Sequence, residues 1–119
     1  MSKTTASTVL LVDDEETQLH IRRLLLEAAG YRTLVALTPS GALRLFEHEP
    51  VDAAVVDYFM PEMSGDELCR SMKRIKPEIP LILLSGIIPE DLSDCPDYVV
   101  VKGFSTQELL DKIAELVAR

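Results

Sequence analysis

Five polar side chains in this sequence are of types that could act together on a phosphoryl group. One short apolar run ends at Asp13 and Asp14, and another ends at Asp57. Two later apolar runs end at the hydroxyl of Ser85 and at the ammonium group of Lys102. A carboxylate can attack phosphorus as a nucleophile and form an aspartyl phosphate. Phosphoryl transfer otherwise requires mainly positioning and neutralisation of charge, to which a hydroxyl and an ammonium group can contribute.

Three carboxylates brought together would repel one another strongly. Two unit charges about 4 Å apart interact by about 4 kcal/mol at an effective dielectric of about 20, and three would oppose folding by an amount comparable to a domain's stability. Proton uptake could offset this repulsion, but Mg²⁺ suits hard oxygen ligands better and binds one or two carboxylates together with phosphate oxygens. We therefore expect Mg²⁺ at Asp57 and at Asp13 or Asp14. The charge pattern alone does not show which carboxylate reacts.

The elements that would position these side chains alternate along the chain. Apolar runs that indicate strands cover residues 8–12, 31–37, 52–57, 80–85 and 98–101. The runs are apolar throughout, as in strands buried on both faces, and helical patterns lie between them, which favours a parallel α/β sheet. Five strands and four or five helices predict a small doubly wound fold. In open sheets of this kind ligands bind beyond the carboxyl ends of the strands, so the five polar side chains should converge there.

Helix-start signals and apolar spacing locate the helices. Thr38-Pro39 offers an N-cap followed by a first-turn proline. Ser64 and Glu67 have the spacing of a capping box, and so do Ser105 and Glu108. In the helix expected over residues 17–29, an apolar face is predicted from the spacing of Ile21, Leu24, Leu25 and Ala28.

Size and composition predict one domain over residues 1–119. The net charge is -8, so direct binding to the phosphates of DNA or RNA is not expected. The apolar run at residues 9–12 is too short for a signal peptide or a membrane span, so we expect no membrane contact and a cytoplasmic location.

The chain has two cysteines, Cys69 and Cys95, and no CxxC motif, a pattern that favours two unpaired thiols.

Four motifs, each at a strand end, resemble the receiver domain of two-component response regulators. They are "LLVDDEE" at residues 10–16, "DYFMPEMSG" at 57–65, "LILLSG" at 81–86 and "VKGFS" at 101–105. The resemblance extends from about residue 9 to residue 117. It implies a flavodoxin-like, doubly wound sheet of five parallel strands in the order 2-1-3-4-5.

The resemblance also implies a role for each matched residue. The phosphoryl donor would be a phosphohistidine on a sensor histidine kinase or a histidine phosphotransfer protein, and the downstream partner is not specified. Such a domain is a phosphoacceptor and not an enzyme, although it can catalyse its own phosphorylation and dephosphorylation. Apolar Phe59 and Ile87 would flank the site, which predicts slow dephosphorylation because they cannot orient water. The implied roles are phosphoacceptor for Asp57, Mg²⁺ binding for Asp13, Asp14, Asp57 and the backbone carbonyl of Phe59, contact with the phosphoryl group for Lys102, and switch hydroxyl for Ser85.

Three departures from the family pattern lie in the second half of the chain. Gly103 follows Lys102 where the family usually has proline, so we expect a more mobile loop. The stretch from Ser85 to Lys102 is about one helical turn short, so the fourth helix should be short or missing. The family's switch aromatic sits three residues before the lysine, where this chain has Val99, and strand alternation should point Tyr98 to the opposite face. Since the family's output face lies here, we expect an altered output surface.

Two other functions are compatible with parts of the sequence. A receiver-like adaptor that binds its partner without phosphate would explain the three departures, but it would not need the complete set of phosphorylation residues. A Mg²⁺-dependent phosphatase or a flavin binder on a related fold is the other alternative. Phe59 stands where the haloacid dehalogenase pattern requires a second aspartate, and the acidic residues 13–16 would repel a flavin phosphate. The sequence leaves open whether the domain stands alone or belongs to a longer chain.

Overall fold

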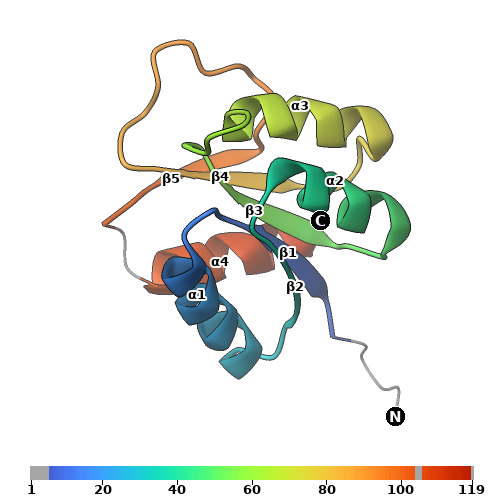
Figure 1. Cartoon of the computed structure of the whole chain (residues 1–119). Helices are drawn as coiled ribbons and strands as arrows, with labels where there is room; N and C mark the ends of the chain where they lie inside the picture. Colours follow the sequence, from blue (N-terminus) through green and yellow to red (C-terminus); the bar gives the residue numbers. More distant parts are fainter. Residues whose placement is uncertain (1–5, 104–105, 119) are drawn as a thin grey trace.

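Five parallel strands form a sheet that is covered by helices on both faces (Figure 1). This computed structural model describes residues 6–103 and 106–118. The strand order β2-β1-β3-β4-β5 confirms the predicted flavodoxin-like arrangement. In chain order the elements are β1 (Thr8–Val12), α1 (Glu16–Ala28), β2 (Arg32–Ala36), α2 (Pro39–His48), β3 (Ala53–Asp57), α3 (Gly65–Ile75), β4 (Leu81–Ser85), β5 (Tyr98–Val101) and α4 (Thr106–Val117).

The sheet separates two apolar clusters. Helices α2 and α3 cover one face, where Leu10 packs with Phe46 and Met72. Helices α1 and α4 cover the other face, where Leu11 packs with residues such as Ile113. Successive residues of a strand point to opposite faces, so β1 supplies both clusters. All five residues of β3 and all five of β4 are buried, which explains why these runs are apolar up to their last residues, Asp57 and Ser85.

Two of the predicted helix starts are confirmed. The backbone N–H of Glu67 donates to Ser64 Oγ at 3.1 Å, and the N–H of Ser64 donates to Glu67 Oε1 at 3.1 Å, which completes the capping box of α3. Thr38 Oγ1 accepts from the N–H of Gly41 at 3.1 Å at the start of α2. The predicted capping residue Ser105 lies outside the described residues.

The prediction of which face of α1 is buried is wrong. The buried residues of this helix are Leu19, Arg22 and Leu26, which recur at helical spacing on a different stripe. The apolar residues of the predicted face that contact solvent are Ile21 (47% exposed), Leu24 (51%) and Leu25 (40%). The prediction relied on apolar residue types and therefore excluded Arg22 from the buried face. Arg22 can be buried because its charge is paired with Asp13.

The helix that the family has between β4 and β5 is missing, which agrees with the prediction that it would be short or missing. Residues 86–97, called here the β4–β5 segment, contain no helix and connect β4 to β5. In Figure 1 the segment forms a loop beside α3. Strand β5 still pairs in parallel with β4, from Ile82 opposite Tyr98 to Ser85 opposite Val101. The sheet is therefore complete although its last connection is not helical.

Tyr98 and Val99 point to opposite faces of the sheet, as strand alternation predicted. Val99 packs against the cluster under α2 and α3. Tyr98 packs against the cluster under α1 and α4, and Lys112 Nζ lies 4.1 Å from the centre of its ring. Tyr98 therefore has a packing role, including a cation–π contact.

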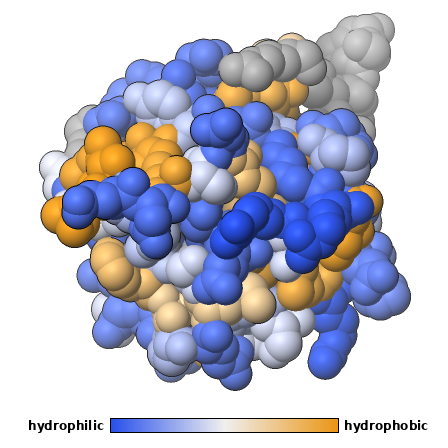
Figure 2. Space-filling model, turned by 90° about the horizontal axis from the view of Figure 1, so that it is seen from above, coloured by the Kyte–Doolittle hydropathy of each residue, from blue (hydrophilic) through white to orange (hydrophobic). Residues whose placement is uncertain are grey.

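The face of the molecule that Figure 2 shows is mainly polar. Figure 2, which looks down from above the view in Figure 1, shows hydrophilic side chains over most of this face, with separate apolar patches between them. No helix within residues 6–103 or 106–118 is both long enough and apolar enough to cross a membrane.

Candidate functional site

Three aspartates meet where β1 and β3 end. The two strands are parallel neighbours, with Val12 opposite Val56, so the residues that follow Val12 lie beside the end of β3. Carboxylate oxygens of Asp13, Asp14 and Asp57 lie within 4.8 Å of one another. Asp13 and Asp57 are buried, whereas Asp14 is exposed. The predicted convergence of these three side chains is therefore present.

Lys102 joins the cluster from the end of β5. Its backbone N–H donates to the carbonyl oxygen of Ser85 at 2.7 Å, which extends the β4–β5 pairing by one residue. Its side-chain Nζ lies 2.5 Å from Asp57 Oδ1. Gly103 follows with a φ of 97°, a left-handed conformation that glycine adopts without steric cost. The lysine therefore reaches the carboxylate cluster from across β4.

A fifth charged residue in the site, Arg22, was not predicted from the sequence. Arg22 Nη1 lies 3.0 Å from Asp13 Oδ2, and the arginine and aspartate side chains are only 10% and 1% exposed. The other oxygen of Asp13 accepts from the N–H of Glu15 at 2.9 Å. Since both oxygens of Asp13 have protein partners, this aspartate is held in place by contacts within the chain.

Asp57 Oδ1 has the environment of a cation ligand. The atom is buried, and the polar contact that the described residues give it is the ion pair with the Lys102 ammonium. Buried polar atoms are normally hydrogen-bonded. A hard divalent cation coordinated by carboxylate oxygens would satisfy this atom, so the donor set fits Mg²⁺.

Burial raises the pKa of Asp57 above its usual value, and the nearby charge of Asp13 raises it further, although the Lys102 ammonium lowers it. The net direction is upward. The buried site therefore favours the protonated carboxyl relative to an exposed aspartate, unless positive charge is added.

The raised pKa of Asp57 predicts how stability depends on pH without divalent cations. The protonated carboxyl stabilises the folded state fully below the unfolded pKa of about 3.9, and this contribution is lost as the pH rises through the folded pKa. We expect the free energy of unfolding of the wild type, relative to Asp57→Asn, to fall as the pH is raised from about 4. Urea unfolding of both proteins in a chelator at several pH values measures the difference. If the wild type stayed equally stable relative to Asp57→Asn, or became more stable relative to it, as the pH rose, the prediction would be wrong.

Ser85 is buried at the end of β4, and its hydroxyl donates to the carbonyl oxygen of Ile87. This contact ties the hydroxyl to the start of the β4–β5 segment.

The side chains of Phe59 and Ile87 are 59% and 66% exposed, and the ring of Phe59 packs edge-on against Tyr58 with centroids 4.7 Å apart. The metal-binding role of the Phe59 carbonyl stays a prediction.

The loop after Asp57 folds back tightly onto its own strand. The backbone N–H of Gly65 donates to the carbonyl oxygen of Tyr58 at 2.7 Å. A Cβ atom on Gly65 would approach the carbonyl oxygen of Asp57 to 2.4 Å. Glycine at the start of α3 therefore allows the helix to begin directly against the end of β3.

The sequence matches the response regulator receiver domain family over residues 9–114. It is 33% identical over 116 residues to the response regulator SaeR of Staphylococcus aureus (strain USA300), a match that covers 93% of this chain and 50% of SaeR. The chain therefore spans about half the length of the curated relatives it matches.

Solved structures of similar chains share the fold over nearly their whole length. A CheY-like response regulator receiver domain protein from Methanospirillum hungatei JF-1 superposes with a TM-score of 0.91 at 27% identity, and the match covers 96% of this chain and 95% of that one. The response regulator TrrA from Thermotoga maritima, solved in complex with Mg²⁺ and BeF, gives a TM-score of 0.87 at 31% identity, with coverage of 92% and 98%.

Proposed function

Because the chain belongs to the response regulator receiver domain family of two-component systems, we propose that it is a signalling domain that accepts a phosphoryl group on Asp57. The observation that carries this proposal is the meeting of Asp57 with two further aspartates and with Lys102 at one end of the sheet. Asp57 is also the carboxylate that contacts the lysine directly. The solved complex of TrrA with Mg²⁺ supports the proposal by relationship.

In the proposed reaction, an oxygen of the Asp57 carboxylate attacks the phosphorus of a phosphohistidine. The new phosphorus–oxygen bond forms as the phosphorus–nitrogen bond breaks, and the imidazole leaves with the electron pair of that bond. Asp13, Asp14 and Asp57, with the Phe59 carbonyl, would hold Mg²⁺, which would neutralise charge on the phosphoryl oxygens. Lys102, beside Asp57 Oδ1, adds a fixed positive charge at the reacting carboxylate.

Ser85 would connect the phosphoryl group to the β4–β5 segment. Its hydroxyl donates to the carbonyl of Ile87, so donating to a phosphoryl oxygen requires release of that carbonyl. The start of the segment would then be free to move. We place the switch of the domain at this exchange of hydrogen-bond acceptors.

Phosphohistidine donors of the family are histidine kinases, and we propose a sensor kinase or a histidine phosphotransfer protein as the donor here. The output partner would be a protein that binds the surface around the β4–β5 segment. The net charge of -8 argues against direct contact of this domain with nucleic acid. We propose a cytoplasmic location, where these donors present their phosphohistidine.

The proposed phosphorylation is tested by incubating the chain with Mg²⁺ and acetyl phosphate. We expect intact-mass spectrometry to show one added phosphoryl group, and fragmentation to place it on Asp57. A chelator should abolish the adduct, because charge neutralisation at the three aspartates would be lost. If neither acetyl phosphate nor a cognate kinase gave an adduct, the phosphate-independent adaptor would be favoured, and turnover of varied phosphate esters would favour a phosphatase.

A further inference from the structure

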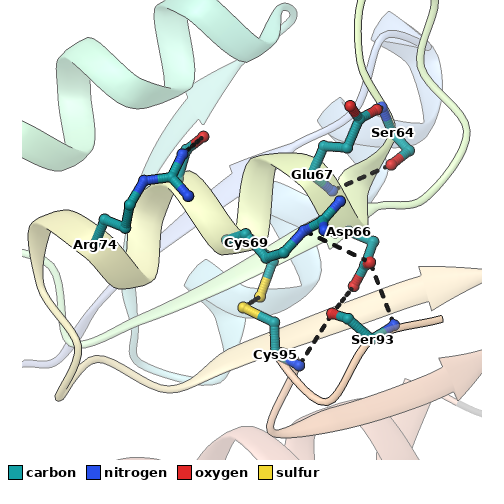
Figure 3. Close-up of polar contacts among 9 residues, drawn as sticks. Ser64, Asp66, Glu67, Cys69, Arg74, Ser93 and Cys95 are labelled. Carbon is teal, nitrogen blue, oxygen red and sulfur yellow. Dashed lines mark hydrogen bonds and ion pairs between the residues drawn. The ribbon is translucent and has the colours of Figure 1, made fainter.

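One stripe of α3 faces residues 93–97 of the β4–β5 segment through matched side chains. Helix positions i, i+3 and i+7 lie on one side of a helix, and three alternate residues of the segment contact that side. Three pairs of side chains therefore join α3 to the segment: a hydrogen-bonded pair, a pair of sulfur atoms and an ion pair. Figure 3 shows the first two of them. The pairs are Asp66 with Ser93, Cys69 with Cys95, and Lys73 with Asp97.

The first and third pairs hold the segment on the helix. Ser93 donates to the buried carboxylate of Asp66 through its hydroxyl at 2.7 Å and its N–H at 3.3 Å. Lys73 Nζ lies 2.8 Å from Asp97 Oδ2. The same oxygen accepts from the N–H of Leu81 at 2.8 Å, so this pair also connects the segment to the start of β4. The cysteines therefore lie between two anchored points.

The sulfur atoms of Cys69 and Cys95 lie 2.7 Å apart, although 26 residues separate them in the chain. Both are free thiols. A disulfide has an S–S distance of about 2.05 Å, so bond formation requires only a small approach. Cys69 is 1% exposed, whereas Cys95 is only partly buried. The pair therefore has one sulfur inside the fold and one that reagents can reach.

We propose that Cys69 and Cys95 form a reversible redox site, in which a disulfide between them fastens the β4–β5 segment to α3. The oxidant would be a low-molecular-weight disulfide. In a reducing compartment such a bond is expected to be transient and to act as a sensor. The site is separate from the phosphorylation chemistry, and its formation does not depend on the proposed function of Asp57.

The exchange takes place in two balanced steps. The Cys95 thiolate attacks one sulfur of the oxidant, which gives a mixed disulfide and releases one small thiolate. The Cys69 thiolate then attacks the Cys95 sulfur, which forms the Cys69–Cys95 bond and releases the second small thiolate. The two protons of the protein thiols end on the two released small thiols, and two electrons pass from the protein to the oxidant. Burial raises the pKa of the Cys69 thiol, so the second step should accelerate with rising pH.

The disulfide should restrict the segment because it adds a covalent bond at the centre of three contacts. It would hold residues 93–97 on the helix even when the flanking hydrogen bonds open. Backbone amides of the β4–β5 segment should then exchange hydrogen more slowly in the oxidised protein. Phosphorylation is not needed for this effect, so it can be measured without Mg²⁺ or a phosphoryl donor.

The test uses the full chain equilibrated with oxidised glutathione. We expect the monomer to lose two hydrogens in intact mass, to lose both sites of alkylation by N-ethylmaleimide in denaturant, and to regain them with dithiothreitol. Hydrogen exchange of residues 86–97 should slow in the oxidised form. Two persistent free thiols, stable mixed disulfides or intermolecular dimers would each overturn the proposal. A disulfide that leaves hydrogen exchange of the segment unchanged would overturn the fastening role.

A variant with its thiol moved by one residue tests whether the position of Cys95 beside Cys69 determines the rate of disulfide formation. Asp94 is exposed and adjacent to Cys95, which is only partly exposed, so Asp94→Cys combined with Cys95→Ser moves the thiol by one residue to a position that faces solvent. This variant leaves the buried Cys69 unchanged, so its core is not disturbed. We expect at least a tenfold slower intramolecular oxidation than in the wild type, and an equal rate would overturn the proposal.

Discussion

An Asp57→Asn variant is expected to take up no phosphoryl group from acetyl phosphate or from a histidine kinase. The amide lacks the charged oxygen that attacks phosphorus, while its size and shape preserve the fold around it. Since Asp57 is 3% exposed and lies beside Asp13 and Lys102, the exchange also removes a buried charge. We therefore expect complete loss of the adduct in intact-mass spectrometry, together with an unchanged or higher free energy of unfolding.

The matched control is Asp94→Asn, which makes the same chemical change at an exposed aspartate. This control should be phosphorylated at the wild-type rate. An adduct that persists at full yield on Asp57→Asn would show that a different side chain is phosphorylated. Asp13 and Asp14 would then be the next carboxylates to replace, because both lie in the same cluster.

Gly65→Ala is expected to destabilise the fold by about 3 kcal/mol, at the upper end of the range for overpacked sites. The added Cβ would lie 2.4 Å from the Asp57 carbonyl oxygen, 2.7 Å from Leu83 Cδ1 and 2.9 Å from Tyr58 Cα. Two of these atoms belong to the backbone, so they cannot move aside by a change of rotamer. Relief requires α3 to shift away from β3, which also displaces the loop after Asp57. Urea unfolding monitored by circular dichroism measures the effect.

Gly86→Ala is the control for this substitution, because a Cβ on Gly86 would meet no atom within 4 Å. It should change the free energy of unfolding by less than about 1 kcal/mol in either direction. Similar losses in the two variants would mean that close packing at the start of α3 is not the cause. A stable Gly65→Ala protein would require the helix to begin differently from the structure described above.

Much of the fold could be predicted because its signals are local. The strands read as apolar runs, and β1 and β5 begin and end at the predicted residues 8–12 and 98–101. The order of polar residues at strand ends, together with the rule that ligands bind there, placed Asp13, Asp14, Asp57 and Lys102 together. The missing helix before β5 followed from a short, proline-containing segment without helical periodicity.

The contacts that could not be predicted depend on how distant elements meet. Arg22 stands at helical spacing from Leu19 and Leu26, but a charged residue on a packed stripe is unexpected until its partner Asp13 is placed. The proximity of Cys69 to Cys95 depends on the path of the β4–β5 segment, which has no periodic signal. A search for alternating polar residues opposite a helical stripe at i, i+3 and i+7 could have suggested that contact.

The Arg22–Asp13 pair gives the acidic site a positive charge that cannot dissociate. A bound ion leaves when its concentration falls, but a guanidinium belongs to the chain and stays charged at any physiological pH. Asp13 is therefore balanced at every magnesium concentration. The free energy of unfolding should consequently change less with magnesium concentration than it would if all three carboxylates lacked a positive partner. A cell with fluctuating magnesium would then retain folded protein throughout.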